Sequence, residues 1–260
     1  MNAILTLLAL RRYAVDRLTA ADVDAPRLTA EVVLAHALAI SRTQLLARSD
    51  GTLLPDQLAR VQRDLDRLVD NEPLAYVVGH REFYDIDLLT DARALIPRPE
   101  TECLIEQALK GLASSAAPVI ATDLSPDALD LARENAQRIG VADRINFRLG
   151  NLLEPVTETL DLLAANLPYI DDKDWPYLEK TIRGHEPRMA FTGGSDGLDL
   201  VRRLLDDTPR VTCPGSLILL EIGAYHGDVV TDIAREIFPQ ARIDIKPDYA
   251  GLDRLAVIKV

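Results

Sequence analysis

The chain has 260 residues, of which 48% are hydrophobic, and a formal net charge of −12 at pH 7. This length and composition can bury the core of one large or two modest domains. The acidic balance gives no net attraction for nucleic-acid phosphates, which disfavours general nucleic-acid binding. Cys103 and Cys213 lie far apart and show no CxxC spacing, so we expect neither disulfides nor a zinc site, and a cytoplasmic location.

The apolar stretch at residues 4–10 is too short to span a membrane. Its arginines, Arg11 and Arg12, follow the stretch, whereas a secretory signal carries its positive charge first. No later segment reaches the roughly 20 apolar residues that a membrane helix requires. We therefore expect neither export nor membrane insertion.

Residues 1–72 have the pattern of a small helical bundle. Turn signals at residues 49–51 and at Pro55 separate two of its helices. A docking surface for a partner is compatible with this region, but no sequence feature marks one. Two sets of apolar residues recur at helical spacing: Leu28, Val32, Ala35 and Ala39, and then Leu58, Val61, Leu65 and Leu68.

Residues 73–97 resemble a β-hairpin linker between two domains. Two short β-rich runs, residues 73–79 and 83–89, flank a charged turn. After the linker, Pro99 is placed to open a helix that continues to Leu109.

From residue 98 to residue 260 the pattern alternates between strand and helix. Ser125 and Pro126 have the residue types of a helix start, and Gly140 that of a helix end. The alternation predicts a mostly parallel sheet with helices on both faces, whose ligands bind beyond the carboxyl ends of the strands. The expected strands are residues 119–122, 144–149, 160–165 and 216–222, and the expected later helices are residues 198–205 and 229–237.

The corner Asn166-Leu167-Pro168-Tyr169 closes the hydrophobic strand at 160–165 and is the most informative feature of the chain. An Asn-x-Pro-Tyr corner at a strand end can grip a planar amide or amine, because it offers hydrogen-bond acceptors beside an aromatic ring. Pro168 stiffens the turn and favours an extended backbone at Leu167. The corner therefore predicts methylation of a nitrogen atom.

Six blocks, in order along nearly the whole chain, resemble the peptide chain release factor glutamine methyltransferases, the PrmC/HemK family. The resemblance implies a Rossmann-like α/β methyltransferase domain at residues 98–260, preceded by a helical bundle that docks the release factor. It further implies methyl transfer from S-adenosyl-L-methionine to the side-chain amide of the glutamine in the Gly-Gly-Gln loop of class 1 peptide chain release factors. The blocks are residues 73–84, 96–102, 166–169, 186–188, 193–199 and 251–254.

The family pattern also implies roles for single residues at the corner. The Asn166 side-chain oxygen and the Leu167 carbonyl would accept the two amide hydrogens of the substrate, and Tyr169 would form a wall beside the flat amide. Leu167 stands where the family more often has a first proline, so some rigidity is lost while the carbonyl acceptor remains. Phe83 is a further candidate for the wall of the glutamine pocket, although a phenylalanine in a hairpin more often serves packing.

Four residues are candidates for binding the cofactor. Asp123 ends its strand, where a carboxylate can accept hydrogen bonds from both ribose hydroxyls, or can simply precede the Ser125 helix cap. Asn151 stands where the family commonly has an aspartate that faces the adenine amino group. Leu152 can pack on the adenine or belong to the core, and Asn166 borders the methyl group.

Other readings compete with this assignment. The turn at residues 221–227 follows a strand and could pass for a cofactor loop in a permuted methyltransferase, but it matches the family's own late-strand block. An adenine N6-methyltransferase on DNA or RNA uses a similar corner, as do ribosomal RNA adenine dimethyltransferases, while a degenerate protein that only binds the release factor is the non-enzyme alternative. We expect no metal site, because the four histidines lack ligand spacing: His36, His80, His185 and His226.

One family element is missing from the sequence. In this family a strand, an Asp-x-Gly-x-Gly cofactor loop and a helix precede the strand that carries Asp123. Here residues 112–119 connect the helix directly to that strand, and no glycine lies between Gly111 and Gly140. The deletion amounts to roughly 20 to 25 residues and predicts weak cofactor binding. Either the strand at 119–122 moves into the vacant place beside the strand at 160–165, or the chain folds poorly.

Overall fold

The structure is a computed structural model, and it describes residues 6–48, 53–112 and 118–260. The chain divides into two compact units. The first contains residues 1–80 together with 179–185, and the second contains residues 81–178 together with 186–260. Within the described ranges, no helix combines the length and the apolar character needed to cross a membrane.

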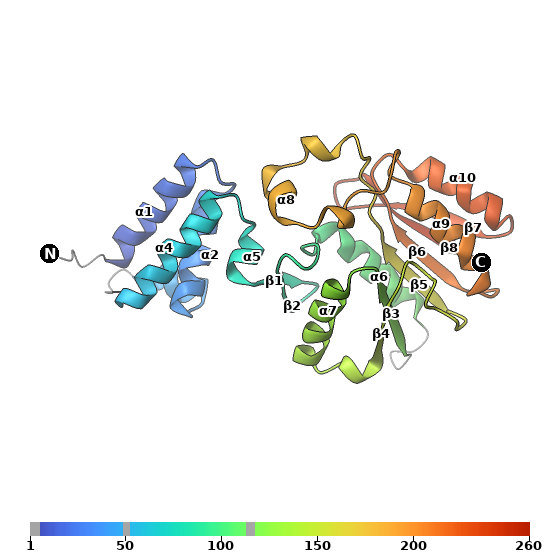
Figure 1. Cartoon of the computed structure of the whole chain (residues 1–260), viewed down its shortest axis with the longest axis horizontal. Helices are drawn as coiled ribbons and strands as arrows, with labels where there is room; N and C mark the ends of the chain where they lie inside the picture. Colours follow the sequence, from blue (N-terminus) through green and yellow to red (C-terminus); the bar gives the residue numbers. More distant parts are fainter. Residues whose placement is uncertain (1–5, 49–52, 113–117) are drawn as a thin grey trace. The chain divides into compact units, whose positions relative to one another are not determined.

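The first unit is helical, as expected. Its core is formed by residues such as Leu10, Leu34 and Leu65, which have no exposed surface. Pro55 occupies the first turn of its helix, while the turn expected at residues 49–51 lies outside the described residues. Five helices make up most of the unit: α1 (Leu7–Ala20), α2 (Pro26–Leu38), α3 (Arg42–Ala47), α4 (Pro55–Val69) and α5 (Leu74–Val78) (Figure 1).

The two sets of apolar residues have different outcomes. Val61, Leu65 and Leu68 are buried, which confirms the packing face expected for α4. The face expected for α2 is partly wrong, because Leu28 is 43% exposed. The buried face of α2 instead passes through Ala30, Val33, Leu34 and Ala37.

The hairpin differs from the expected one. Residues 74–78 form helix α5 rather than a strand. The hairpin pairs β1 (His80–Phe83) with β2 (Ile86–Leu89). Its two turn residues, Tyr84 and Asp85, both have positive φ angles, 48° and 61°, which is the backbone of a tight two-residue hairpin turn. The apolar run at 74–78 suits a buried helix as well as a strand, so its composition alone could not decide between them.

The second unit is built around a four-stranded sheet in the order β5-β6-β8-β7. Helices cover both faces, as expected (Figure 1). Ile218 and Leu220 of β6 pack in the cluster that contains α9 and α10 residues, whereas Leu219 packs with Leu104 of α6. The elements are α6 (Glu102–Gly111), β5 (Leu162–Asn166), α9 (Asp199–Asp207), β6 (Leu217–Glu221), α10 (Gly227–Ile237), β7 (Arg242–Pro247) and β8 (Asp253–Lys259).

The sheet is mixed rather than mostly parallel. β5 and β6 run parallel, whereas β8 is antiparallel to both β6 and β7. The last two strands had not been expected, although Ile243 and Ile245 alternate with charged residues in the manner of a strand. Pro99 opens the short helix η1 (Pro99–Thr101), which leads directly into α6 and confirms the expected helix start.

A separate two-stranded parallel sheet contains β3 (Val119–Asp123) and β4 (Ile145–Leu149). Helix α7 (Pro126–Ile139) connects them, with the Ser125 cap and the Gly140 end that were predicted. The hypothesis that β3 moves in beside β5 is wrong, because in the described part of the chain β3 pairs with β4 alone. Most of the connection where the deletion was expected, residues 113–117, lies outside the described residues.

Candidate active site

The Asn-Leu-Pro-Tyr corner begins at the carboxyl end of β5. Asn166 is the last residue of this strand, and in the parallel register it lies opposite Glu221, the last residue of β6. The side chains that follow two neighbouring strands therefore meet at one edge of the sheet, which is where ligands bind in α/β folds.

Asn166 is exposed at this edge and does not point into the core. Its Nδ2 atom donates a hydrogen bond of 3.2 Å to Oγ1 of Thr101, at the start of α6. No residue in the described part of the chain donates to its Oδ1 atom. The hydrogen bond to Thr101 fixes the amide plane, so the acceptor oxygen is held in place and remains available to a ligand.

Tyr169 is held by a buried carboxylate. Its hydroxyl donates to Oε1 of Glu221 at 3.2 Å and accepts from Nη1 of Arg254 at 3.4 Å, while the Arg254 guanidinium lies 6.0 Å from the centre of the Tyr169 ring. Burial and the nearby Glu221 charge raise the pKa of Tyr169 to about 12. The hydroxyl is therefore occupied and protonated, and the ring is the part of Tyr169 that can act on a substrate.

Glu221 is only 2% exposed. Burial raises the pKa of its carboxyl above the usual 4.5, and the hydroxyls of Thr101 and Tyr169 counter this only in part. Its Oε2 atom is buried and has no hydrogen-bond partner of normal geometry among the described residues. A buried carboxylate oxygen without a partner is rare in proteins, so Glu221 is unusual at the end of a strand. The carboxylate connects Thr101, at the start of α6, with Tyr169 of the corner.

Glycines allow a second segment to pack tightly against the corner. A Cβ atom on Gly193 would collide with the carbonyl oxygen of Pro168, and one on Gly197 would collide with that of Tyr169. The amide of Gly193 donates to the carbonyl of Ile170 at 2.9 Å. Gly197 also has a φ angle of 73°, which favours glycine. The block at 193–199 therefore clamps the corner from one side.

Phe83 ends strand β1 and is partly buried. The next residue, Tyr84, donates its backbone amide to Oε1 of Glu102 at 3.2 Å. Because Thr101 precedes Glu102 and binds Asn166, the start of α6 connects the hairpin to the corner. The substrate wall proposed for Phe83 remains a prediction.

The three residues expected at the adenosine end come together at the ends of β3 and β4. The Gly150 amide donates to the carbonyl of Asp123 at 3.0 Å, and the Thr122 hydroxyl donates to the carbonyl of Leu152 at 3.1 Å. Asp123 is exposed, and its Oδ1 atom accepts the Ser125 amide at 2.8 Å, as expected of a residue that precedes the helix cap, while ribose binding remains a prediction. Leu152 packs against the main core cluster, and Asn151 is partly buried.

The described residues fit only one half of S-adenosyl-L-methionine. Asp123 and Asn151 supply oxygen acceptors suited to ribose hydroxyls and an adenine amine. The described glycine-rich turn at the end of β5, residues 193–197, already packs against the carbonyls of Pro168 and Tyr169, so it is not free to accept the methionine half. The turn at residues 221–227 does not replace it, because a Cβ on Gly223 would already meet His226 Nδ1 at 3.0 Å and Tyr169 Cδ2 at 3.5 Å. The space at Gly223 is therefore taken by His226 of the same turn and by the Tyr169 ring.

Three residues of this site had been given no role from the sequence: Thr101, Glu221 and Arg254. Thr101 and Arg254 fall in the family blocks 96–102 and 251–254, and Glu221 begins the turn at 221–227. A buried carboxylate at a strand end cannot be recognised from sequence, because neither its burial nor its tyrosine partner is local in the chain. Among the described residues, no group of three or more His, Cys, Asp and Glu side chains is arranged to hold a metal ion.

Two family models match adjacent parts of the chain. Residues 9–79 match the PrmC N-terminal domain, and residues 80–173 match the RMKL-like methyltransferase domain. A solved structure of the hMettl16 catalytic domain in complex with MAT2A 3'UTR hairpin 1 has a TM-score of 0.54 at 11% identity, with 81% of this chain and 83% of that chain covered, so it shares the fold.

Two relatives align over almost their full length. Release factor glutamine methyltransferase from Moorella thermoacetica is 40% identical, with 93% of this chain and 94% of the relative covered. The enzyme of that name from Nitratidesulfovibrio vulgaris is 35% identical, with 96% and 93% covered. The first alignment runs over 266 residues and the second over 278, so both relatives carry residues that have no counterpart in this 260-residue chain. The chain belongs to the release factor glutamine methyltransferase family.

Proposed function

We propose that this protein methylates the side-chain amide nitrogen of the glutamine in the Gly-Gly-Gln loop of class 1 peptide chain release factors. The observation that carries the proposal is Asn166, which is exposed at the end of β5, with its Nδ2 atom bound to Thr101 and no donor to its Oδ1 atom among the described residues. Membership of the family and the names of the two relatives support the choice of substrate.

An amide nitrogen is a poor nucleophile because its lone pair is delocalised into the carbonyl, so positioning carries most of the catalysis. In the proposed complex, Asn166 Oδ1 and the Leu167 carbonyl accept the two amide hydrogens, and the Tyr169 ring and Phe83 enclose the flat group. Pro168 keeps the corner rigid. S-adenosyl-L-methionine, when bound, supplies the methyl group.

We propose further that this chain binds the cofactor weakly. Asp123, Asn151 and Leu152 are placed to hold adenosine, with Asn166 at the border of the methyl group. The sequence has no glycine between Gly111 and Gly140 to form the loop that would hold the methionine end, and the longer alignments of both relatives support an internal deletion. β3 and β5 also belong to different sheets, so the two halves of the site are not joined by strand pairing.

The separation of the two sheets favours one alternative, a protein that binds the release factor through residues 1–72 without methylating it. Purified release factor incubated with methyl-labelled cofactor over a wide concentration range distinguishes the two. Label on the Gly-Gly-Gln glutamine, located by peptide mass spectrometry, is expected at high cofactor concentration. Capture of the release factor without label at any concentration would refute methylation and leave the binding function.

The same reaction mixture also tests the nucleic-acid reading. Adenine-containing DNA and RNA are offered with the labelled donor in place of the release factor. We expect no label in them, because the acidic chain offers no net attraction for phosphates. Label on adenine in the absence of glutamine labelling would replace the proposal with an adenine methyltransferase.

A further inference from the structure

The helical unit carries a basic groove on an otherwise acidic chain. Two adjoining hollows, of about 230 Å³ and 380 Å³, share Arg27 and Glu31 as lining residues. The first is also lined from α1, by residues that include Arg11 and Arg12, and the second by Arg42 of α3. We call the two hollows together the α2 groove.

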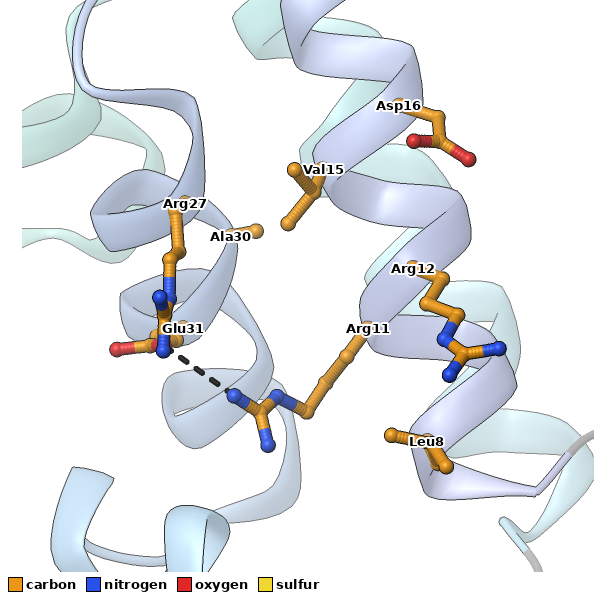
Figure 2. A pocket seen from close by; sticks show the side chains of 8 residues that line it. All are labelled: Leu8, Arg11, Arg12, Val15, Asp16, Arg27, Ala30 and Glu31. Atoms are coloured by element: carbon orange, nitrogen blue, oxygen red, sulfur yellow. Dashed lines mark hydrogen bonds and ion pairs between the residues drawn. The ribbon is translucent and has the colours of Figure 1, made fainter.

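Glu31 organises the arginines of this groove. It is 3% exposed, and its Oε1 atom accepts from Arg11 Nη2 and Arg27 Nε at 3.3 Å each, while Oε2 accepts from Arg42 Nε at 2.9 Å. Figure 2 shows Arg11 reaching from α1 towards Glu31 on α2. Burial alone would raise the pKa of this carboxyl, but hydrogen bonds from Arg42 and Arg27 lower it below its usual value.

The groove retains positive charge after Glu31 has been neutralised. Four arginines line it, against Glu31 and Asp16 as the carboxylates among the described lining residues. The side chains of Arg27 and Arg42 are 80% and 53% exposed. Each guanidinium has five N–H donors, so one hydrogen bond to Glu31 leaves most of them available. Guanidinium groups bind carboxylates with two parallel hydrogen bonds.

Apolar side chains accompany this charge. Leu8, Leu28 and Leu46 also line the α2 groove and are 45%, 43% and 44% exposed. Leucines exposed beside arginines suit a ligand that carries both carboxylates and apolar groups, rather than a bare anion. A nucleic acid fits less well, because the whole chain has a net charge of −12 and repels phosphate backbones at longer range.

We infer that the α2 groove docks an acidic, leucine-bearing peptide segment of the release factor substrate. This inference rests on the proposed function and gives the helical unit a specific contact chemistry. The arginines bind the carboxylates of the segment, and the exposed leucines cover its apolar side chains. Docking through residues that do not touch the reacting atoms contributes affinity and leaves the methyl-transfer step unchanged.

The test compares two double variants of the full chain that have the same net charge. Arg12→Ala with Arg27→Ala removes two groove arginines and leaves Arg11 and Arg42 on Glu31. The control, Arg60→Ala with Arg63→Ala, removes two exposed arginines of α4. Binding of purified release factor is measured by calorimetry, and binding of a fluorescein-labelled peptide of alternating glutamate and leucine by anisotropy.

We expect the groove variant to bind both ligands about tenfold more weakly, because charge-assisted hydrogen bonds are lost, and the control to match the wild type. Leu28→Ser, which changes no charge, is expected to weaken binding in the same direction and serves if the double variant does not fold. Equal binding of release factor by wild type and all variants would overturn the inference while the proposed function stands.

Two further outcomes separate the claims. The wild type could fail to bind the release factor and still bind the glutamate-leucine peptide more tightly than the groove variant does. That result would refute the proposed substrate and retain an acidic-peptide site. A short single-stranded RNA that binds more tightly than the peptide, and that the groove variant equally weakens, would reassign the groove to phosphates. Binding of neither the release factor nor the peptide would overturn both proposals.

Discussion

The buried carboxylate of Glu221 gives a prediction that tests the site without requiring activity. Glu221→Gln keeps the shape of the side chain and removes its charge. The folded pKa of Glu221 is raised above 4.5, so its contribution to stability is complete below that pH and is lost as the pH rises through the folded pKa. Glutamine has no such loss, so the variant should gain stability over the wild type as the pH increases.

The size of this gain follows from the surroundings of the carboxylate. Oε1 has the Tyr169 hydroxyl as its donor, whereas Oε2 has no partner of normal geometry among the described residues. A buried group left without its hydrogen bond costs about 1–3 kcal/mol. We therefore expect the difference in the free energy of unfolding between Glu221→Gln and wild type to rise by about 1–3 kcal/mol between about pH 4 and about pH 8.

Urea unfolding at a series of pH values measures this difference. Trp175 is the only tryptophan and lies in the second unit, so its fluorescence reports on the part of the chain that contains Glu221. Glu154→Gln, at an exposed position, is the matched control and should show the pH dependence of the wild type. A difference that is constant with pH, or that falls as the pH rises, would refute the account of Glu221 as a poorly compensated buried carboxylate.

Four other predictions concern the corner, the clamp, the groove and the cofactor. Tyr169→Phe removes the hydroxyl that donates to Glu221 and should lower the free energy of unfolding by about 1–3 kcal/mol. The decrease should be largest at high pH, and a decrease that did not grow with pH would contradict the hydrogen bond between Tyr169 and Glu221. In Gly197→Ala the new Cβ atom would collide with the Tyr169 carbonyl, so this variant should destabilise the second unit more than Gly215→Ala. Gly215 also has a positive φ angle, but a Cβ atom there would meet no atom within 4 Å. Equal melting temperatures of the two variants would argue against the clamp. Glu31→Gln should destabilise the helical unit above about pH 4.5, because the ionised Glu31 carboxylate stabilises the wild type there and this contribution is lost on acidification. The melting temperature is followed by helical circular dichroism. A variant that melts at the wild-type temperature at neutral pH would contradict the role of Glu31. Calorimetric titration of the wild type with S-adenosyl-L-methionine should give a dissociation constant well above the micromolar range, and micromolar binding would refute the proposed effect of the deletion.

The sequence predicted those parts of the fold whose signals are local. Ser125, Pro126 and Gly140 mark the limits of α7 because capping and backbone preferences act within a few residues. The buried spacing of α4 followed from its own periodicity. The run at 74–78 was misassigned because a short apolar segment suits a strand and a buried helix equally well.

Features that depend on distant partners could not be predicted. β3 pairs with β4 and β5 pairs with β6, and the sequence of these strands does not show whether the two pairs share one sheet. Leu28 has the spacing of a core residue, but α2 turns it towards the groove, where it is exposed. At the corner, Asn166 was identified from its motif, whereas its partner Thr101 lies 65 residues away.

The most direct test of the central claim is the rate of methyl incorporation into the Gly-Gly-Gln glutamine of a release factor at high cofactor concentration, measured for the wild type, Asn166→Ala and Asn146→Ala. Asn146 is an exposed asparagine on β4 and serves as the matched control. Loss of a positioned hydrogen-bond acceptor should slow Asn166→Ala by about 10²–10³-fold and leave Asn146→Ala at the wild-type rate. Equal rates for all three proteins would contradict the claim that the Asn166 corner orients the substrate amide.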